Sequence, residues 1–221
     1  IIEDDIKLDY SDVLIRPKRS ALTSRFDVEM ERTYTFYHSR KEWTGVPVIA
    51  SNMDTTGTFE MHNELSKHGM TTCIARHYNR DGKKWIQAEH KNKLCVMSGI
   101  SDTEISEIIG VAMTFSDVAF VGLDVANGYT MNFVDSVKRL RNELPNATII
   151  AGNVVTGDMV AELIVAGVDI VKVGIGGGSV CTTRIKTGIG YPQLSAVIEC
   201  ADAAHGLGGH IIADGGCNFS G

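Results

Sequence analysis

Short apolar runs alternate with longer amphipathic stretches along almost the whole chain. The apolar runs begin near Val46, Met70, Leu94, Val118, Ala147, Asp169 and Gly209, and the first five recur at intervals of 24, 24, 24 and 29 residues. Apolar positions with helical spacing lie between them, at residues 59–68, 102–115, 132–144, 158–166 and 192–205. The interval between the apolar runs matches the length of a repeated βα unit. The alternation therefore predicts a parallel sheet covered by helices.

Two parallel architectures have this alternation, and the position of the glycines separates them. An open doubly wound sheet would carry a GxGxxG turn after its first strand, whereas the comparable glycine run here follows the sixth. Polar residues end almost every predicted strand: Asn52, Asp54, His77, Ser98, Asp124, Asn127, Asn153, Cys181 and Asp214. In a barrel those ends converge on one mouth. We therefore expect a (β/α)8 TIM barrel.

The length bears on how much of that barrel is present. A (β/α)8 barrel typically takes about 250 residues, and this chain has 221. We expect a single barrel domain over residues 1–221 that holds about seven of the eight βα units and stops before the eighth strand. The absence of an initiator Met suggests trimming or a fragment.

Composition excludes several classes of function. The chain is 43% hydrophobic and 22% charged, which is typical of a globular domain, and its apolar runs fall short of the roughly 20 residues that cross a bilayer. Acidic residues occupy the N-terminus where a signal peptide would carry positive charge, so we expect a cytoplasmic protein.

The net charge of −6 argues against non-specific nucleic-acid binding. A local basic cluster at Arg16, Lys18, Arg19 and Arg25 suits either a phosphorylated small molecule or a solvated surface.

The glycine-rich run from Gly174 to Arg184 is the strongest candidate for chemistry. It places Cys181 directly after a predicted strand, on a turn whose backbone groups are free to hold ions or phosphate. Polar neighbours in this loop favour a reactive thiolate, which makes Cys181 a candidate nucleophile. Cys73, Cys95 and Cys200 lie in apolar patterns and are expected to be inert. Five cysteines with no CxxC pair argue against disulfides and against a zinc site in this chain.

Three other strand ends remain ambiguous from the residues alone. The segment that begins at Asp214 could bind a sugar diol and a phosphate, or form a common Asp-Gly turn. The segment from Asp124 to Gly128 could be functional or could cap a helix. Asn52 to Asp54 is similarly open. Five histidines have no spacing that suggests metal ligands, and we expect them to be surface or hydrogen-bonded residues: His38, His62, His68, His90 and His210.

Seven ordered segments together carry a family resemblance that covers almost the whole chain. They are residues 14–20 (LIRPKRS), 52–55 (NMDT), 124–129 (DVANGY), 151–157 (AGNVVTG), the Cys181 loop, 190–196 (GYPQLSA) and 214–216 (DGG). With them the chain resembles the guanosine monophosphate (GMP) reductases, in the barrel superfamily that also holds inosine monophosphate (IMP) dehydrogenase. The dehydrogenases share the cysteine loop and Asp-Gly-Gly but usually carry a regulatory domain after the second strand. Here only about 20 residues separate the second and third apolar runs, so we expect no such insertion.

The resemblance implies a reaction for Cys181. Its sulfur would attack C2 of GMP, ammonia would leave to give a thioimidate, and NADPH would supply a hydride before IMP is released. Thr183 matches the hydroxyl that assists proton transfer to the departing amine. Its partner in the family is a glutamate that would lie beyond residue 221. We therefore expect the 221-residue chain alone to be weakly active or inactive.

The resemblance also implies binding roles and an assembly. Backbone carbonyls of Gly176, Gly178 and Cys181 match a potassium site. Substrate contacts fall on Met53, Ser179, Asp214, Gly215 and Gly216. Positions at or beside the NADPH contacts are Ser24, Arg25, Arg76, Asp124, Val125, Ala126, Ile175 and Gly176, with Arg25 acting across a subunit boundary. Members of the family form homotetramers, and the resemblance implies the same assembly for this chain.

Two segments depart from the family pattern, and two other functions stay open. Gly177 stands where the family usually has proline, which predicts a more mobile loop. Ala75-Arg76-His77 replaces histidine, lysine, histidine, and arginine is not equivalent to lysine at a phosphate or stacking position. The alternatives are a non-catalytic nucleotide-binding fragment or hetero-oligomer partner, and an IMP dehydrogenase that uses NAD.

Overall fold

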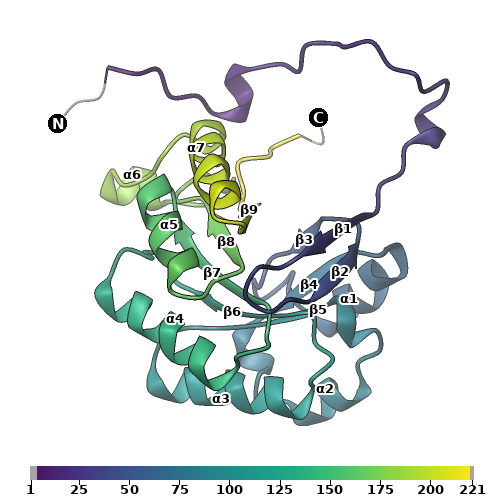
Figure 1. The fold of residues 1–221 in the computed structure, drawn as a ribbon, viewed down its shortest axis with the longest axis vertical. Helices are drawn as coiled ribbons and strands as arrows, with labels where there is room; N and C mark the ends of the chain where they lie inside the picture. The colour runs from purple at the N-terminus through teal and green to yellow at the C-terminus, as the bar shows by residue number, and fades with distance from the viewer. Residues whose placement is uncertain (1–3, 220–221) are drawn as a thin grey trace.

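The computed structural model describes residues 4–219, which form a curled parallel sheet of seven strands with helices on its outer side (Figure 1). The strands are β3 (Ile49–Ala50), β4 (Thr71–Ile74), β5 (Leu94–Ser98), β6 (Phe120–Asp124), β7 (Ile149–Val154), β8 (Ile170–Val173) and β9 (His210–Ala213). Each strand pairs in parallel with the next along the chain, from β3 at one edge to β9 at the other. The prediction of a partial TIM barrel with seven βα units is confirmed.

The helices alternate with these strands. They are α1 (Phe59–Leu65), α2 (Gly82–Gln87), α3 (Asp102–Thr114), α4 (Met131–Glu143), α5 (Gly157–Val165), α6 (Thr183–Thr187) and α7 (Gln193–Gly206). Five of them match the predicted stretches to within a few residues, and the short 3-10 helix η3 (Ser66–His68) continues α1. The short helices α2 and α6 were not predicted. Hydroxyl side chains begin several helices: Thr58, Ser101 and Thr130 each accept a hydrogen bond from the first turn.

Alternate residues of each strand face opposite sides of the sheet, as the pleat requires. Val96, Val121 and Val171 face outward and pack against the helices. Met97 and Ile150 belong to a second buried cluster inside the curl. Burial on both faces explains the apolar runs in the sequence, because such strands have no polar face to alternate with. No helix among residues 4–219 is long and apolar enough to cross a membrane.

A β-hairpin that the sequence pattern did not reveal covers the inner cluster at the N-terminal ends of the strands. Its strands are β1 (Arg32–Thr35) and β2 (Glu42–Gly45), paired antiparallel. Phe36, at the turn, is buried and meets Phe120 edge-to-face at 5.7 Å, and Trp43 also contacts the Phe120 ring. The hairpin therefore closes one end of the barrel, and the carboxyl ends of the strands lie at the other.

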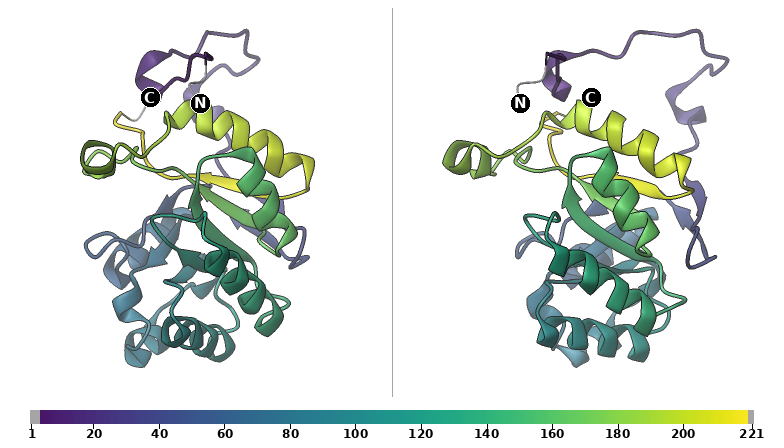
Figure 2. Two further views of the ribbon diagram at one scale, coloured as in Figure 1. Left: turned by 90° about the vertical axis from the view of Figure 1, so that its left-hand side faces the viewer. Right: turned by 60° about the vertical axis from the view of Figure 1, so that its left-hand side comes forward.

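The segment before the hairpin runs outside the barrel. It contains the 3-10 helices η1 (Tyr10–Asp12) and η2 (Arg25–Asp27), and residues 13–30 arc away from the sheet in each view (Figures 1 and 2). Apolar side chains in this arc are open to solvent in the single chain, with Leu14 97% and Phe26 88% exposed. Exposed apolar side chains gathered on an extended segment indicate a contact with another surface.

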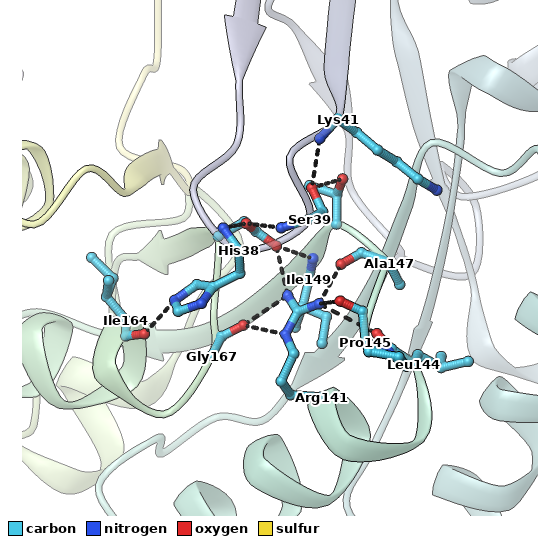
Figure 3. A network of polar contacts seen from close by, with 12 residues as sticks. His38, Ser39, Lys41, Arg141, Leu144, Pro145, Ala147, Ile149, Ile164 and Gly167 are labelled. Atoms are coloured by element: carbon cyan, nitrogen blue, oxygen red, sulfur yellow. Dashed lines mark hydrogen bonds and ion pairs between the residues drawn. The ribbon is translucent and has the colours of Figure 1, made fainter.

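A buried ion pair fastens the hairpin to the barrel (Figure 3). The Asp169 carboxylate is fully buried and accepts hydrogen bonds from the backbone N–H groups of His38 at 2.8 Å and Ile149 at 3.0 Å. The Arg141 guanidinium donates to the same carboxylate at 2.7 Å. It also donates to the carbonyl oxygens of Leu144, Pro145, Ala147 and Gly167. Nearly every donor and acceptor of the pair is therefore used, as burial requires.

Arg141→Met is expected to lower the free energy of unfolding by about 3–5 kcal/mol, because it leaves the Asp169 charge buried and uncompensated. Arg139, on the same helix, provides a matched control: its partner Asp102 has a side chain 94% exposed. Arg139→Met should cost about 1 kcal/mol or less. Urea unfolding of both variants at pH 7 measures the difference. Equal losses would show that the buried network is not a principal source of stability.

Candidate active site

A buried lysine joins the carboxyl ends of three strands at the mouth of the barrel. Lys172, on β8, extends its ammonium to 3.1 Å from Oδ2 of Asp124 and 3.2 Å from Oδ2 of Asp214. Its side chain is only 11% exposed. Burial disfavours the ammonium, but the two carboxylates outweigh that effect and raise the pKa of Lys172 above its usual value. The lysine is therefore a permanent cation between two acids at neutral pH.

Two asparagine side chains complete this polar cluster. Asn52, after β3, donates its amide to Asp124 at 2.7 Å. Asn153, on β7, donates to Asp214 at 2.7 Å and to the carbonyl oxygen of Gly174 at 2.7 Å. Side chains from separate βα units thus converge, as the barrel prediction required. Asn52, Lys172 and Asp214 also line a cavity of about 120 Å³, whose inner wall is formed by Cys73, Met97 and Ile150.

The loop that carries Cys181 leaves β8 and packs against the loop after β9. Gly174 has φ 147°, and a Cβ there would lie 2.5 Å from the carbonyl oxygen of Asp214. Gly215 has φ 79°, and its Cβ would lie 3.2 Å from the Cα of Gly178. Glycine is required at both positions by conformation and by the close approach. The two loops singled out in the sequence are therefore in direct contact.

Cys181 and Thr183 form the chemical centre of this loop. The Cys181 sulfur lies 3.3 Å from the hydroxyl oxygen of Thr183, close to the start of α6. Hydrogen bonds from the Thr183 hydroxyl and backbone N–H to the sulfur lower the pKa of Cys181, and the positive charge of Arg184 adds to the effect. The thiol is partly exposed. A partly exposed cysteine whose pKa is lowered in this way has the properties of a nucleophile.

Other cysteines lack these properties. Cys73, Cys95 and Cys200 are buried, as predicted. Burial raises the pKa of Cys200 to about 12 and that of Cys95 well above its usual value. Within residues 4–219, His, Cys, Asp and Glu side chains form no group of three that could hold a metal ion. Cys73, Cys95 and Cys200 are therefore poorer nucleophiles than Cys181.

Most of the remaining predicted site residues lie at the ends of strands or in the two loops of the mouth. Val125 and Ala126 directly follow Asp124 at the end of β6, and Ile175 is buried where the Cys181 loop begins. Met53, three residues after β3, and Ser179, in the Cys181 loop, are both exposed. Gly216 follows Gly215 and has φ 81°. Gly176, with φ 80°, packs against the side chain of Arg184.

Three predicted cofactor residues do not meet Cys181 within this chain. Arg76 lies in the 3-10 helix η4 (Arg76–Tyr78) and pairs with Glu104 at 3.2 Å. Ser24 begins η2 and Arg25 belongs to it, and that helix lies in the arc outside the barrel (Figures 1 and 2). For Ser24 and Arg25 a role in the site requires a second copy of the chain, as the resemblance implied for Arg25.

The sequence analysis missed two residues of the site. Lys172 is the one charged residue inside the apolar run of β8, and that position is the signal by which it could have been found. Gln193 is fully buried and donates its amide to the carbonyl oxygen of Val173 at 2.9 Å, beneath the Cys181 loop. The alternative reading of Asp124 as a helix cap does not hold, because Thr130 caps α4.

Comparison with known proteins places this chain in a family. Residues 7–221 match the model of the IMP dehydrogenase / GMP reductase domain. The chain belongs to that family. It is 54% identical over 223 residues to GMP reductase 1 of Homo sapiens and 55% identical over 224 residues to the GMP reductase of Caenorhabditis elegans. Both matches take in the whole chain, which spans 65% and 63% of those relatives.

A solved structure of the same family agrees with the fold. The crystal structure of inosine 5'-monophosphate dehydrogenase from Legionella pneumophila superposes with a TM-score of 0.83 at 32% sequence identity. The match covers 97% of this chain and 64% of that one. The partial barrel therefore corresponds to about two thirds of a longer polypeptide in each of these relatives.

Lys172→Met is expected to destabilise the fold by about 3–5 kcal/mol at pH 7, because Asp124 and Asp214 lose the cation that compensates them. Lys172→Arg keeps the charge and serves as the control, with a smaller loss. Denaturant unfolding at pH 7 measures both losses, and an equal effect of the two variants would contradict the expectation.

Thr183→Val is expected to slow alkylation of Cys181 at pH 7 and to move the midpoint of its pH profile upward. The folded-state pKa is lowered by hydrogen bonds from Thr183, so removal of the hydroxyl reduces the thiolate fraction at neutral pH. Thr183→Ser keeps the hydroxyl and should stay near the unsubstituted protein. Mass spectrometry of the Cys181 peptide after iodoacetamide treatment measures each rate. A profile unchanged by valine would refute the role of the hydroxyl.

Proposed function

We propose that this chain is the barrel of a GMP reductase, which converts GMP to IMP and ammonia with NADPH. The observation that carries the proposal is the pairing of the Cys181 thiol with Thr183 at the end of β8, beside the loop of Asp214 and Gly215. Identity of 54–55% to GMP reductases supports the same activity. We further propose that the barrel is a single domain without an inserted regulatory unit.

In this proposal Cys181 acts as the nucleophile. Its thiolate adds to C2 of the guanine ring, and the electron pair of the C2=N3 double bond moves onto N3. The exocyclic amine then takes up protons and leaves as ammonia, giving a thioimidate between C2 and sulfur. The hydroxyl of Thr183, 3.3 Å from the sulfur, is placed to pass a proton to that amine. After reduction at C2, the carbon–sulfur bond breaks, the thiolate is restored and IMP is released.

The nucleotide would lie across the contact between the two loops. The Asp214 carboxylate is fixed by Lys172 and Asn153, so it is preorganised to accept hydrogen bonds from the ribose diol. Gly215 and Gly216 lack side chains and have positive φ, which lets phosphate approach their backbone. Met53 and Ser179 are exposed beside these groups and would contact the base and the phosphate.

NADPH, when bound, supplies the hydride that C2 receives. Asp124, Val125 and Ala126 at the end of β6, and Ile175 and Gly176 at the start of the Cys181 loop, fit its nicotinamide end. They fit because they lie on one rim of the mouth, two strands apart. A guanidinium suits the 2′-phosphate, so Arg76 and the cross-subunit pair Ser24 and Arg25 would hold the other end.

The Cys181 loop also fits a potassium ion. The backbone carbonyl of Gly178 accepts one hydrogen bond, from the Cys181 N–H at 2.9 Å, and keeps a second lone pair for an ion. Beside the loop, the buried Oε1 of Gln193 has no hydrogen-bond donor among the described residues. Carbonyl oxygens are the ligands that hard cations prefer. Gly176, Gly178 and Cys181 would hold the ion through their carbonyl groups and so fix the loop.

We infer that the working form is a homotetramer. The N-terminal arc exposes apolar side chains that its own barrel does not cover, including Leu14, Ile15 and Phe26. A second copy that buried this arc would also bring Ser24 and Arg25 to a neighbouring mouth. A site completed across a subunit boundary explains why two cofactor residues lie outside their own barrel.

Binding of GMP or IMP is expected to protect Cys181 from alkylation, because the base would cover the sulfur. AMP, with an amine at C6 and none at C2, is the matched control and should protect at least about tenfold less effectively, which corresponds to 1.4 kcal/mol in binding. In a polypeptide as long as these relatives, NADPH oxidation coupled to IMP formation measures turnover, and Cys181→Ala should abolish it while nucleotide binding persists. Lack of protection by millimolar GMP and IMP would refute the proposed function. NAD reduction with IMP, without NADPH oxidation by GMP, would favour the dehydrogenase.

A further inference from the structure

Arg184 is enclosed between the two loops that surround the nucleophile. It lies in the first turn of α6, three residues after Cys181. A Cβ at Gly176 or at Gly190 would come within 2.5 Å or 2.6 Å of its Cγ, so both glycines leave room for its stem. Its guanidinium donates to the backbone carbonyl of Tyr191. The Arg184 side chain is therefore packed between the Cys181 loop and the loop that precedes α7.

The charge that holds Arg184 comes from the opposite end of the chain. Oδ2 of Asp9 lies 3.2 Å from Nη1 of Arg184, across a sequence separation of 175 residues. The other carboxylate oxygen, Oδ1, accepts the backbone N–H of Gln193 at 2.6 Å, at the start of α7. Asp9 thus contacts the helix on each side of the loop from Gly188 to Pro192.

Asp9 is itself held in place by its neighbour. The backbone N–H of Leu8 donates to the hydroxyl of Ser195 at 2.8 Å, and the N–H of Ser195 donates to the carbonyl of Leu8 at 3.1 Å. The N-terminal segment is thereby fastened to α7 just before it turns outward. The ion pair with Arg184 is about one third exposed on each side, and pairs of that exposure contribute little to global stability.

We propose that Asp9 is a positioning residue for Cys181, which acts through Arg184 to hold the nucleophile loop where the thiol meets Thr183. The loop needs such a tether because three consecutive glycines, Gly176 to Gly178, give it little conformational preference of its own. The consequence for turnover rests on the proposed function. The geometry itself does not, because the reactivity of a thiol reports its position whether or not GMP is reduced.

The test is the rate at which iodoacetamide alkylates Cys181 in the 221-residue chain, measured from pH 6 to pH 9 by mass spectrometry of the Cys181 peptide. A Cys217→Ser background removes the other exposed thiol. Asp9→Asn is expected to slow the reaction at pH 7 about threefold or more, the effect of losing a hydrogen bond to the thiolate. Asp9→Glu should restore most of the rate.

The sign of the effect separates positioning from simple electrostatics. Removal of a negative charge near a thiol, without loss of geometry, favours the thiolate and accelerates alkylation. A rate for Asp9→Asn that is equal to or faster than that of the unsubstituted protein would therefore overturn the proposal. Asp5→Asn is the matched control, because Asp5 lies on the same segment and is 86% exposed. It should leave the rate unchanged, and an equal slowing by Asp5→Asn would also overturn the proposal.

A second variant decides the question if Asp9→Asn fails to fold. Arg184→Lys keeps a positive charge near Cys181 but loses the fork that reaches both Asp9 and the Tyr191 carbonyl. It is expected to slow alkylation although the charge is retained, and an unchanged rate would reject the tether. Protection of Cys181 by GMP, measured on the same variants, is a separate readout. Its failure would count against the nucleotide site and leave the tether standing.

Discussion

The mouth of the barrel depends on one buried cation. Asp124 ends β6 and Asp214 directly follows β9, and their carboxylates would repel each other. A buried charge without a partner costs several kcal/mol. The Lys172 ammonium, 3.1 Å and 3.2 Å from the two carboxylates, removes that cost. With Asp214 held by Lys172, Gly215 lies against Gly178, and that contact joins the loop after β9 to the Cys181 loop. Charge compensation inside the barrel therefore supports the position of the loops at its mouth.

The two ends of the barrel have separate tasks. At the N-terminal ends of the strands, Arg141 and Asp169 fasten the hairpin with contacts that use nearly all their hydrogen-bonding capacity. At the carboxyl ends, Cys181 and the exposed glycines of two loops keep groups available for a ligand. This division follows from the barrel itself, in which one face can be optimised for stability without disturbing the loops of the other.

What could be predicted from the sequence follows from the range of the interactions. Strands and helices were predictable because burial of one face repeats at short intervals. Cys181 was a candidate because of its glycine-rich loop, whereas Thr183 was assigned through the family resemblance. Lys172 was not, since one of its carboxylates lies 48 residues away and its own strand reads as apolar. The hairpin was missed because its strands are only four residues long and largely exposed. The carboxylate that accepts hydrogen bonds from the hairpin turn belongs to Asp169, which lies 131 residues beyond His38.

The N-terminal segment connects these local facts to assembly. At Asp9 it touches the arginine that holds the nucleophile loop, and about five residues later it leaves the barrel and exposes Leu14 and Ile15. In the proposed tetramer those side chains would be buried against another copy, which would restrict the path of the chain on both sides of η1. The same restriction would reach Asp9, because Leu8 is hydrogen-bonded to Ser195. Assembly and the geometry of the nucleophile would then depend on one continuous stretch of backbone.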